Sequence, residues 1–311
     1  MDKFCAIIVT FNRKELLLEN LKMIFSQRIT PEHIYIIDNH GSDNTLDYLI
    51  NSNIDMNKIK YSYLENNIGG AGGFCTGLKM AYNDENEWFI LMDDDGRPLD
   101  NDCFANLFST IGDKDPRVNA IFANSLVLYN DKVLSFGLNK LETIDEILAS
   151  GELKNGIIEG IVNPFNGTLL SRKLIDLIGF PNGDFFIRGD EVDYEERALN
   201  ANASVFTVFD SRYFHPKNIK MKKKKIFGHE MYICVDEPWK EYYGTRNRIY
   251  SLLHNSVNKK IAEKEIRFFL RKRYFCVLIS KCKKIETFKM IRRAKKDAYD
   301  GKLGVVKFDR R

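Results

Sequence analysis

The sequence lacks several features that would place it in a narrow class. Its six cysteines are scattered and form no Cys-x-x-Cys pair, which argues against a zinc site and favours reduced, mostly structural thiols. Only 7 prolines and no glycine period occur, and 44% of the 311 residues are hydrophobic, so disorder and collagen-like repeats are excluded. No Gly-x-Ser-x-Gly elbow, His-Glu-x-x-His helix or Cys/His nucleophile pair is present, which argues against hydrolase chemistry by those routes.

Long hydrophobic runs are absent as well. The longest, such as 6–9 and 275–279, are far shorter than the roughly 20 residues that cross a bilayer. The first residues also lack the basic stretch, apolar stretch and small-residue cleavage site of a secretory signal. We therefore expect a cytoplasmic protein that could meet a membrane only at its surface.

The net charge of +4 is the balance of two opposed parts. Residues 259–311 hold 19 basic and 6 acidic residues, a net charge of +13, which leaves −9 on residues 1–258. A further run, 217–225, has six lysines in nine residues. The chain is therefore predicted to have an acidic body and a basic C-terminal region.

Hydrophobic patterning over the body predicts strands and helices in alternation. Continuous β-branched runs indicate buried strands, and apolar residues three or four apart indicate helices. Such alternation is typical of a doubly wound sheet, so the expected fold class is α/β with a mostly parallel sheet flanked by helices. The strands expected are 4–9, 33–37, 59–64, 88–92, 120–128, 167–170 and 203–208, and the helices are 14–27, 45–51, 73–83 and 190–200.

The composition changes after His215, which suggests a boundary near residue 216. Residues 1–216 are predicted to form the main domain, and 217–311 a basic, mainly helical C-terminal region. Because no low-complexity linker separates the two, we expect the C-terminal region to pack on the body.

Polar residues follow four of the expected strands. Ligands of open α/β sheets bind beyond the carboxyl ends of the strands, so these residues are expected along one edge. They are Thr10, Asn12 and Arg13 after the first strand, Asp38 after the second, Asn66 and Asn67 after the third, and Asp93, Asp94 and Asp95 after the fourth.

The three consecutive aspartates predict a metal site. Adjacent carboxylates repel one another, and a hard divalent cation such as Mg²⁺ or Mn²⁺ relieves that repulsion while holding a diphosphate. An acidic turn that caps the next helix is the alternative. The position at the ligand-binding edge of the sheet favours the metal.

Two further segments have alternative interpretations. Four glycines within 69–73 precede an expected helix and could let a ligand approach the backbone, or could simply form a tight connection. Five acids within 190–196 could complement a helix dipole, or could include a general base. His215 alone is more typical of a structural histidine than of a ligand.

In this order, the motifs resemble a GT-A glycosyltransferase of family 2, and 67–74 is similar to its galactofuranosyltransferase branch. The resemblance covers about 1–216. The matching segments are 8–13 (IVTFNR), 37–39 with Gly41 and Ser42, 66–74 (NNIGGAGGF), 93–98 (DDDGRP), 186–198 and 214–216 (FHP).

The resemblance implies a set of donor-binding and metal-binding residues. Uridine of a UDP-sugar would be held by the segment after the first strand and by Asp38, and Mn²⁺ or Mg²⁺ by Asp93, Asp95 and His215. The metal would offset the charge of the departing UDP. The complete donor set implied is Thr10, Phe11, Asn12, Arg13, Asp38, Asn67, Gly69, Gly70, Asp93 and Asp94.

The catalytic base implied by the resemblance is Glu191, at a position where the family usually has aspartate. Asp190 and Asp193 therefore stay as alternatives. The implied mechanism is a single inverting displacement, in which the carboxylate deprotonates the acceptor hydroxyl and no covalent sugar–enzyme intermediate forms.

The segment 242–248 (YYGTRNR) resembles one that follows the transferase core in this family. It would lie beside the donor phosphates or the acceptor, with Trp239, Tyr243 and Arg246 as candidate contacts. The start of a helix at a packing interface is the equally good alternative.

The function implied is transfer of galactofuranose from UDP-galactofuranose to a lipid-linked bacterial surface glycan. A rhamnosyltransferase using dTDP-rhamnose is the nearest alternative, and a nucleotidyltransferase is the alternative of another class. The C-terminal region lacks a nucleic-acid-binding motif, so nucleic acid is not an expected partner. Its cationic residues instead predict peripheral contact with the anionic inner face of the cell membrane. The sequence does not indicate an oligomeric state.

Overall fold

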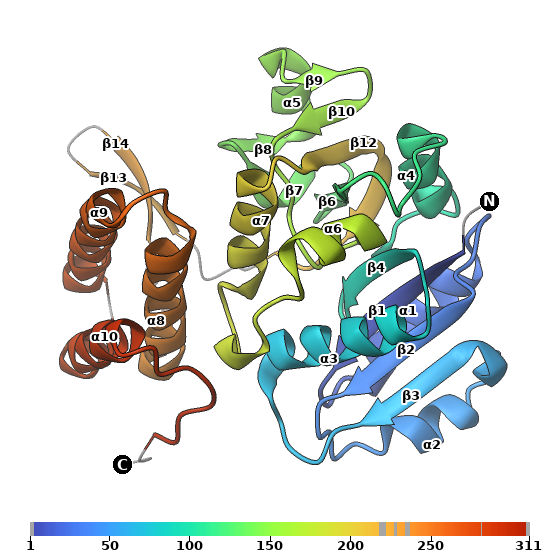
Figure 1. Cartoon of the computed structure of the whole chain (residues 1–311), viewed down its shortest axis with the longest axis horizontal. Coiled ribbons are helices and arrows are strands. Elements are labelled where there is room, and N and C mark those ends of the chain that lie inside the picture. The colour runs from blue at the N-terminus through green and yellow to red at the C-terminus, as the bar shows by residue number, and fades with distance from the viewer. Residues whose placement is uncertain (1–2, 218–221, 227–228, 234–236, 281, 309–311) are drawn as a thin grey trace.

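The computed structural model describes residues 3–217, 222–226, 229–233, 237–280 and 282–308, with side-chain surroundings described outside 218–236 (Figure 1). Cys234 and part of the lysine-rich run 217–225 lie outside the described residues. No helix in the described ranges combines the length and the apolar character needed to cross a bilayer.

A large mixed sheet forms the centre of the body, and its first half is parallel as predicted. The first four strands lie in the order β3-β2-β1-β4, and the sheet continues as β11-β6-β12-β10-β9 with antiparallel pairs at β11 and β10. The bounds are β1 Phe4–Thr10, β2 His33–Asp38, β3 Ile59–Tyr63, β4 Trp88–Asp93, β6 Ile121–Leu128, β9 Leu153–Lys154, β10 Ile157–Glu159, β11 Thr168–Ser171 and β12 Ser204–Phe214.

Helices cover the sheet because both of its faces are apolar. In β1, Ala6 and Ile8 pack into one core and Ile7 and Val9 into the other, which explains the uninterrupted apolar run. The first core includes residues of α1 and α4, and the second includes residues of α3, α6 and α7. The helices of the body are α1 Lys14–Phe25, α2 Thr45–Ile50, α3 Gly69–Asn83, α4 Cys103–Ile111, α5 Ile144–Ser150, α6 Arg172–Ile178 and α7 Asp190–Asn200, with short 3₁₀ helices at Met56–Lys58 and Gly183–Phe185.

The glycine segment is helical, whereas the sequence predicted a turn before a helix starting at 73. Helix α3 begins at Gly69 because its glycines allow close packing on the sheet. A Cβ on Gly73 would lie 2.6 Å from Cγ1 of Val9, and one on Gly77 would lie 2.6 Å from Cγ2 of Ile7. The low helix propensity of glycine is thus outweighed by tertiary packing.

Strand β12 is longer than the predicted 203–208 and carries the chain to His215. Its pairing with β6 shifts between Val208 and Arg212, where a bulge allows the strand to continue. Sequence patterning missed this continuation and also several short strands. These are β5 Arg97–Pro98, which precedes β6 and pairs with β12, and four strands between β6 and β11, namely β7 Val133–Leu138, β8 Leu141–Thr143, β9 and β10.

The C-terminal region packs on the body, as predicted. Figure 1 shows helices α8, α9 and α10 together at one end of the molecule, with α8 beside α7. Ile249, Ile266 and Ile291 belong to a small core that these helices share. The elements are β13 Lys222–Ile226, β14 His229–Ile233, α8 Pro238–Asn255, α9 Lys259–Ile279 and α10 Lys284–Tyr299.

Candidate active site

The carboxyl ends of the first strands bring the predicted polar residues together. In the register of the sheet, Val9 of β1 is level with Asp93 of β4, and Thr10 is level with Asp38 of β2. Three segments that are far apart in the sequence therefore meet at one edge, as expected for a parallel sheet.

Asp94, which follows β4, forms hydrogen bonds with the segment that follows β1. Its carboxylate accepts hydrogen bonds from the Thr10 hydroxyl at 3.0 Å, the Phe11 backbone N–H at 3.3 Å and the Arg13 guanidinium at 3.0 Å. Arg13 also donates to Asp95 at 2.7 Å. Burial raises the pKa of Asp94 to about 6, against the opposing effect of Arg13. Asp94 therefore fixes the backbone of the predicted donor-binding segment.

Asp38 is buried and already has protein partners. Its carboxylate accepts from the Gly41 N–H at 2.7 Å and from the Tyr61 hydroxyl. Asn12, with a positive φ of 54°, accepts from the Ser42 N–H at 2.6 Å. These bonds shape the loops after β1 and β2, while the ring of Phe11 is 44% exposed beside them.

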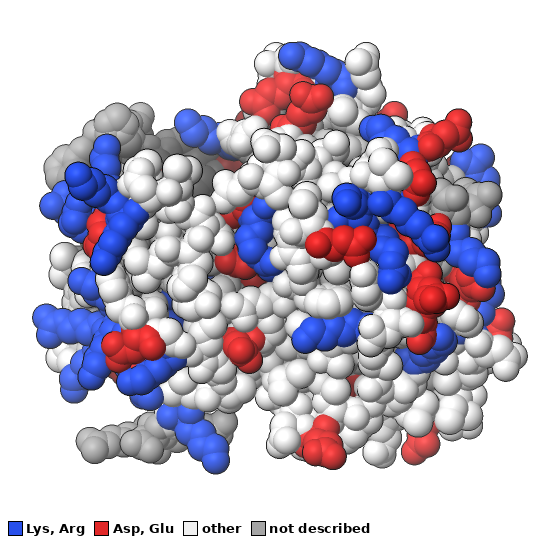
Figure 2. Space-filling view, viewed as in Figure 1, with Lys and Arg blue, Asp and Glu red and all other residues white. Residues whose placement is uncertain are grey.

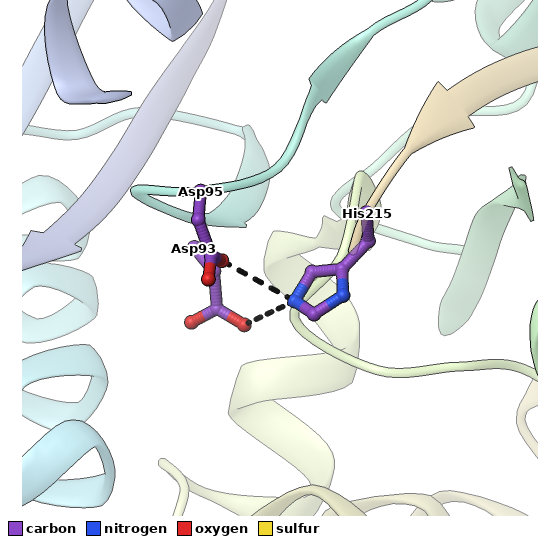
Figure 3. Close-up of side chains that lie close together, drawn as sticks. All are labelled: Asp93, Asp95 and His215. Atoms are coloured by element: carbon purple, nitrogen blue, oxygen red, sulfur yellow. Dashed lines mark ion pairs between the residues drawn. The ribbon is translucent and has the colours of Figure 1, made fainter. Parts of the chain in front are cut away.

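Asp93, Asp95 and His215, the metal ligands that the family resemblance implies, lie together in a cluster that could hold a metal ion. One oxygen of each carboxylate and one ring nitrogen of His215 lie within 4.8 Å of one another. His215 Nε2 is 3.3 Å from Asp95 Oδ1 and 3.7 Å from Asp93 Oδ2. In Figure 3 the imidazole at the end of β12 points toward the two carboxylates at the end of β4. Two oxygens and one imidazole nitrogen suit Mn²⁺ or Mg²⁺.

The charges in this cluster favour a cation at its centre. Burial lowers the pKa of His215, but hydrogen bonds to Asp93 and Asp95 outweigh that effect and raise it to about 10. Burial also raises the pKa of Asp93, whereas for Asp95 the effect of burial is outweighed by His215, so that its pKa is lowered. The two carboxylates thus stabilise positive charge at this partly buried position.

A cavity of about 730 Å³ opens beside the cluster. It is lined by residues from the ends of β4 and β12, from the first turns of α3, from β7 and the turn after it, from the segment after β10 and from α7 with the loop before it. Those with polar or aromatic side chains are Phe74, Asp93, Phe136, Asn139, Asn163, Phe165, Asn166, Arg188, Asp190, Glu191, Glu195 and His215.

The glycine helix contributes backbone to this cavity. Gly70 lines it, and a Cβ on Gly70 would meet nothing within 4 Å. Asn67 precedes the helix and its side-chain oxygen accepts from the Gly69 N–H at 2.9 Å. The start of α3 is therefore open to a ligand at Gly70, as the donor-binding interpretation requires.

The three candidate bases differ in their surroundings. Asp190 and Glu191 line the cavity, whereas Asp193 accepts from Arg197 at 3.0 Å and from Asn255 at 3.0 Å in the packing of α7. Burial, followed by the charge of Glu191, raises the pKa of Asp190 well above its ordinary value. Glu191 accepts from the Gly189 N–H at 3.0 Å.

The three candidate contacts on α8 are not among the described residues that line this cavity. They are Trp239, Tyr243 and Arg246. Arg246 is fully buried and donates to the carbonyls of Gly304 and Phe185 at 2.8 and 3.1 Å, so its guanidinium is used within the protein. Tyr243 is also buried, and its hydroxyl accepts from the Val306 N–H at 2.8 Å. Trp239 is 38% exposed. The packing alternative for this segment fits these contacts, because tertiary hydrogen bonds absorb its polar groups.

Sequence reasoning missed Arg188 and Phe136, which line the cavity, and Asn247, which bonds the loop before α7. Arg188 stands two residues before the acidic cluster, a position that could have drawn attention to it. Phe136 belongs to a strand that the sequence did not predict, and no local signal marks it.

Comparisons with known proteins agree with this geometry. The family model described as glycosyl transferase family 2 matches residues 5–152. Galactofuranosyltransferase GlfT1 of Mycolicibacterium smegmatis is 30% identical over 85% of this chain and 87% of its own length. The dTDP-rhamnosyl transferase RfbF of Shigella flexneri is 25% identical over 85% of each chain.

Solved structures show the same fold at low sequence identity. TarS of S. aureus (residues 1–349, with UDP-GlcNAc) has a TM-score of 0.61 at 16% identity, covering 95% of this chain and 80% of its own. The mannosyltransferase PcManGT of Pyrobaculum calidifontis, with GDP-Man and Mn²⁺, has a TM-score of 0.56 at 16% identity, covering 98% and 76%. With sequence relationship, fold and site in agreement, the chain belongs to glycosyltransferase family 2.

Proposed function

We propose that this glycosyltransferase transfers galactofuranose from UDP-galactofuranose to a hydroxyl of a glycan, with inversion at the anomeric carbon. The observation that carries the proposal is a single cavity lined both by Asp93 and His215 of the metal-ligand cluster and by Asp190 and Glu191 of α7. Displacement of a nucleotide needs charge stabilisation on one side of the sugar and a proton acceptor on the other.

The residues of the cluster fit a divalent cation, Mn²⁺ or Mg²⁺. Asp93, Asp95 and His215 supply two carboxylate oxygens and one nitrogen within 4.8 Å, at the end of a buried strand. Bound there, the cation would supply Lewis-acid stabilisation of the diphosphate leaving group. Relatives in fold were solved with nucleotide sugars, and PcManGT with Mn²⁺.

The protein's own residues then have separate tasks. The segment from Thr10 to Arg13, fixed by Asp94, would hold the nucleotide. Glu191 would accept the proton of the attacking hydroxyl. Burial and the charge of Glu191 raise the pKa of Asp190, which favours the protonated form of that carboxyl and supports Glu191 over Asp190 as the base.

Two nucleotide sugars are candidates for the donor. The relationship to GlfT1 supports UDP-galactofuranose, whereas the relationship to RfbF supports dTDP-rhamnose as the second candidate. Binding and donor hydrolysis measured for both nucleotide sugars with Mn²⁺ present would separate them. Tighter binding and faster turnover of dTDP-rhamnose would overturn the galactofuranose assignment. Because the chain is a glycosyltransferase, the nucleotidyltransferase alternative is not retained.

We propose further that the acceptor is lipid-linked and that the C-terminal helices contact the anionic inner face of the cell membrane. Lys and Arg side chains gather over the end of the molecule formed by these helices (Figure 2). Large apolar side chains are exposed on the same helices, with Phe268 of α9 71% exposed and Ile285 of α10 75% exposed. Cationic residues near an anionic leaflet each gain about 1 kcal/mol, and exposed apolar side chains insert at the interface.

Vesicle sedimentation tests this membrane contact. We expect binding to phosphatidylglycerol vesicles that weakens with salt, and weaker binding by a double variant with Phe268→Ser and Ile285→Ser. Val118→Ser is the matched control, because Val118 is 66% exposed in the body and distant in sequence from these helices. Equal binding by the double variant and the control would contradict the assignment of the surface.

A further inference from the structure

The loop before α7 is bound to the C-terminal region through one side chain. The amide Nδ2 of Asn247 on α8 lies 3.0, 3.1 and 2.7 Å from the carbonyl oxygens of Phe185, Ile187 and Arg188, which share its two N–H donors. Asn247 is fully buried, so these carbonyls receive from it bonds that water does not supply. A single buried side chain thus provides hydrogen-bond donors for three backbone carbonyl groups of the loop that precedes Asp190.

Arg246 fixes the orientation of that amide. Its Nε donates to Asn247 Oδ1 at 2.9 Å, which leaves Nδ2 directed at the loop. Its remaining nitrogens donate to the carbonyls of Asp184 at 3.3 Å and Gly304 at 2.8 Å. The Gly304 N–H in turn donates to the Asp184 carbonyl at 2.7 Å. The segment after α10 therefore belongs to the same network.

The loop has a backbone conformation that needs such support. Phe186 and Arg188 have positive φ angles of 66° and 65°, and Gly189 follows at 88°. Positive φ in a residue with a side chain persists only where the surrounding structure determines it. The loop also meets the glycine helix, since the Phe186 carbonyl accepts from the Ala71 N–H at 3.1 Å. Its conformation thus fixes where α7 begins relative to α3.

We propose that Asn247, held by Arg246, is a positioning residue that sets the carboxylates of Asp190 and Glu191 against the donor side of the cavity. The inference rests on the proposed function, in which those carboxylates serve the transfer. It makes the C-terminal region a part of the catalytic machinery in addition to its contact with a membrane.

Asn247→Ala in the full-length enzyme tests the proposal with two measurements. We expect faster hydrogen exchange in peptides covering 183–192, and a kcat about 10- to 100-fold lower, because small displacements of reacting groups cost that much. The Kd of UDP with Mn²⁺ should stay within about threefold, because the proposed nucleotide segment 10–13 and the metal residues lie at the ends of β1, β4 and β12, whereas the Asn247 amide bonds the loop before α7. A purely structural role would reduce the folded fraction without this difference between kcat and Kd.

Two further variants keep the test decisive. Ile291→Val is the matched control, because it loosens the core of the C-terminal helices away from the loop and should leave kcat unchanged. If Asn247→Ala does not fold, Arg246→Lys takes its place in the test. Lysine keeps the positive charge but loses the planar guanidinium that orients Asn247, so we expect a smaller increase in exchange and a smaller loss of kcat.

The possible failures are distinguishable. Unchanged exchange, or faster exchange with unchanged kcat per folded enzyme, would overturn the positioning role alone. Full transfer by Glu191→Gln would overturn the proposed base, and full transfer by Asp190→Asn as well would overturn the positioning role with it.

Discussion

Gly69 packs so closely on Phe186 that a Cβ on Gly69 would overlap the Phe186 carbonyl oxygen. Gly69 has a φ of +75°, so both space and backbone conformation require glycine there. The contact joins the first turn of α3, on the donor side of the cavity, to the loop that leads into α7. The two halves of the candidate active site are therefore held together by backbone at this point.

Two neighbouring glycines of α3 should respond differently to alanine. Gly73→Ala should lower the free energy of unfolding by about 1–3 kcal/mol, because its Cβ would lie 2.6 Å from Val9 Cγ1 in a packed core. Gly70→Ala should raise it by up to about 1 kcal/mol, since its Cβ meets open space and alanine favours the helix. Urea unfolding measures both.

Gly70→Ala should nevertheless weaken donor binding, because the new methyl group enters the cavity that Gly70 lines. Titration with UDP and Mn²⁺ would detect the loss. Undiminished affinity in a stable Gly70→Ala variant would remove Gly70 from the donor-binding set.

Asp94 should matter for folding as well as for activity. In Asp94→Ala the Thr10 hydroxyl and the Phe11 N–H lose their common acceptor, which should cost about 1–3 kcal/mol in the free energy of unfolding. Glu32→Ala, which removes the exposed partner of Lys3, should cost at most about 1 kcal/mol. Urea unfolding measures both losses of free energy. Equal losses in the two variants would show that the hydrogen bonds of Asp94 to the segment after β1 do not stabilise the fold.

Metal removal should abolish transfer. We expect no activity in excess EDTA, recovery on adding Mn²⁺, and a decrease of about 10²-fold or more in Asp95→Asn and His215→Ala, since both would ligate the cation. Asp113→Asn, at a separate surface depression, is the control and should keep its activity. Full activity in EDTA would exclude the metal-dependent mechanism.

The sequence was sufficient for the parallel half of the sheet and for much of the site. Buried parallel strands are continuous apolar runs, and their carboxyl ends place Thr10, Asp38 and Asp93 at one edge whatever the details of the loops. The prediction of Asp93 and Asp95 as metal ligands followed from their position at the carboxyl end of a buried parallel strand. His215 did not, because a lone histidine carries no pattern and only the family resemblance singled it out.

Other features depend on contacts that no local pattern encodes. Glycines predict a turn by propensity, yet packing against Ile7 and Val9 makes 69–73 helical. The segment 242–248 had two interpretations, and the burial of Arg246 against carbonyls more than 50 residues away in sequence fits the packing alternative. In both segments, contacts that are distant in sequence decide the structure.

Glu195 should give the protein a pH-dependent stability that Glu195→Gln removes. Burial raises its pKa above the ordinary 4.5, against the opposing hydrogen bond from the Val162 N–H. A carboxyl with a raised pKa in the folded state binds protons more tightly there than in the unfolded chain, so stability falls as pH rises above 4.5.

Glutamine at position 195 keeps an acceptor for the Val162 N–H but does not ionise. The free energy of unfolding of Glu195→Gln relative to wild type should therefore increase between pH 4 and pH 7. Urea unfolding at both pH values measures the difference, and a constant or decreasing difference would contradict the role of burial at Glu195.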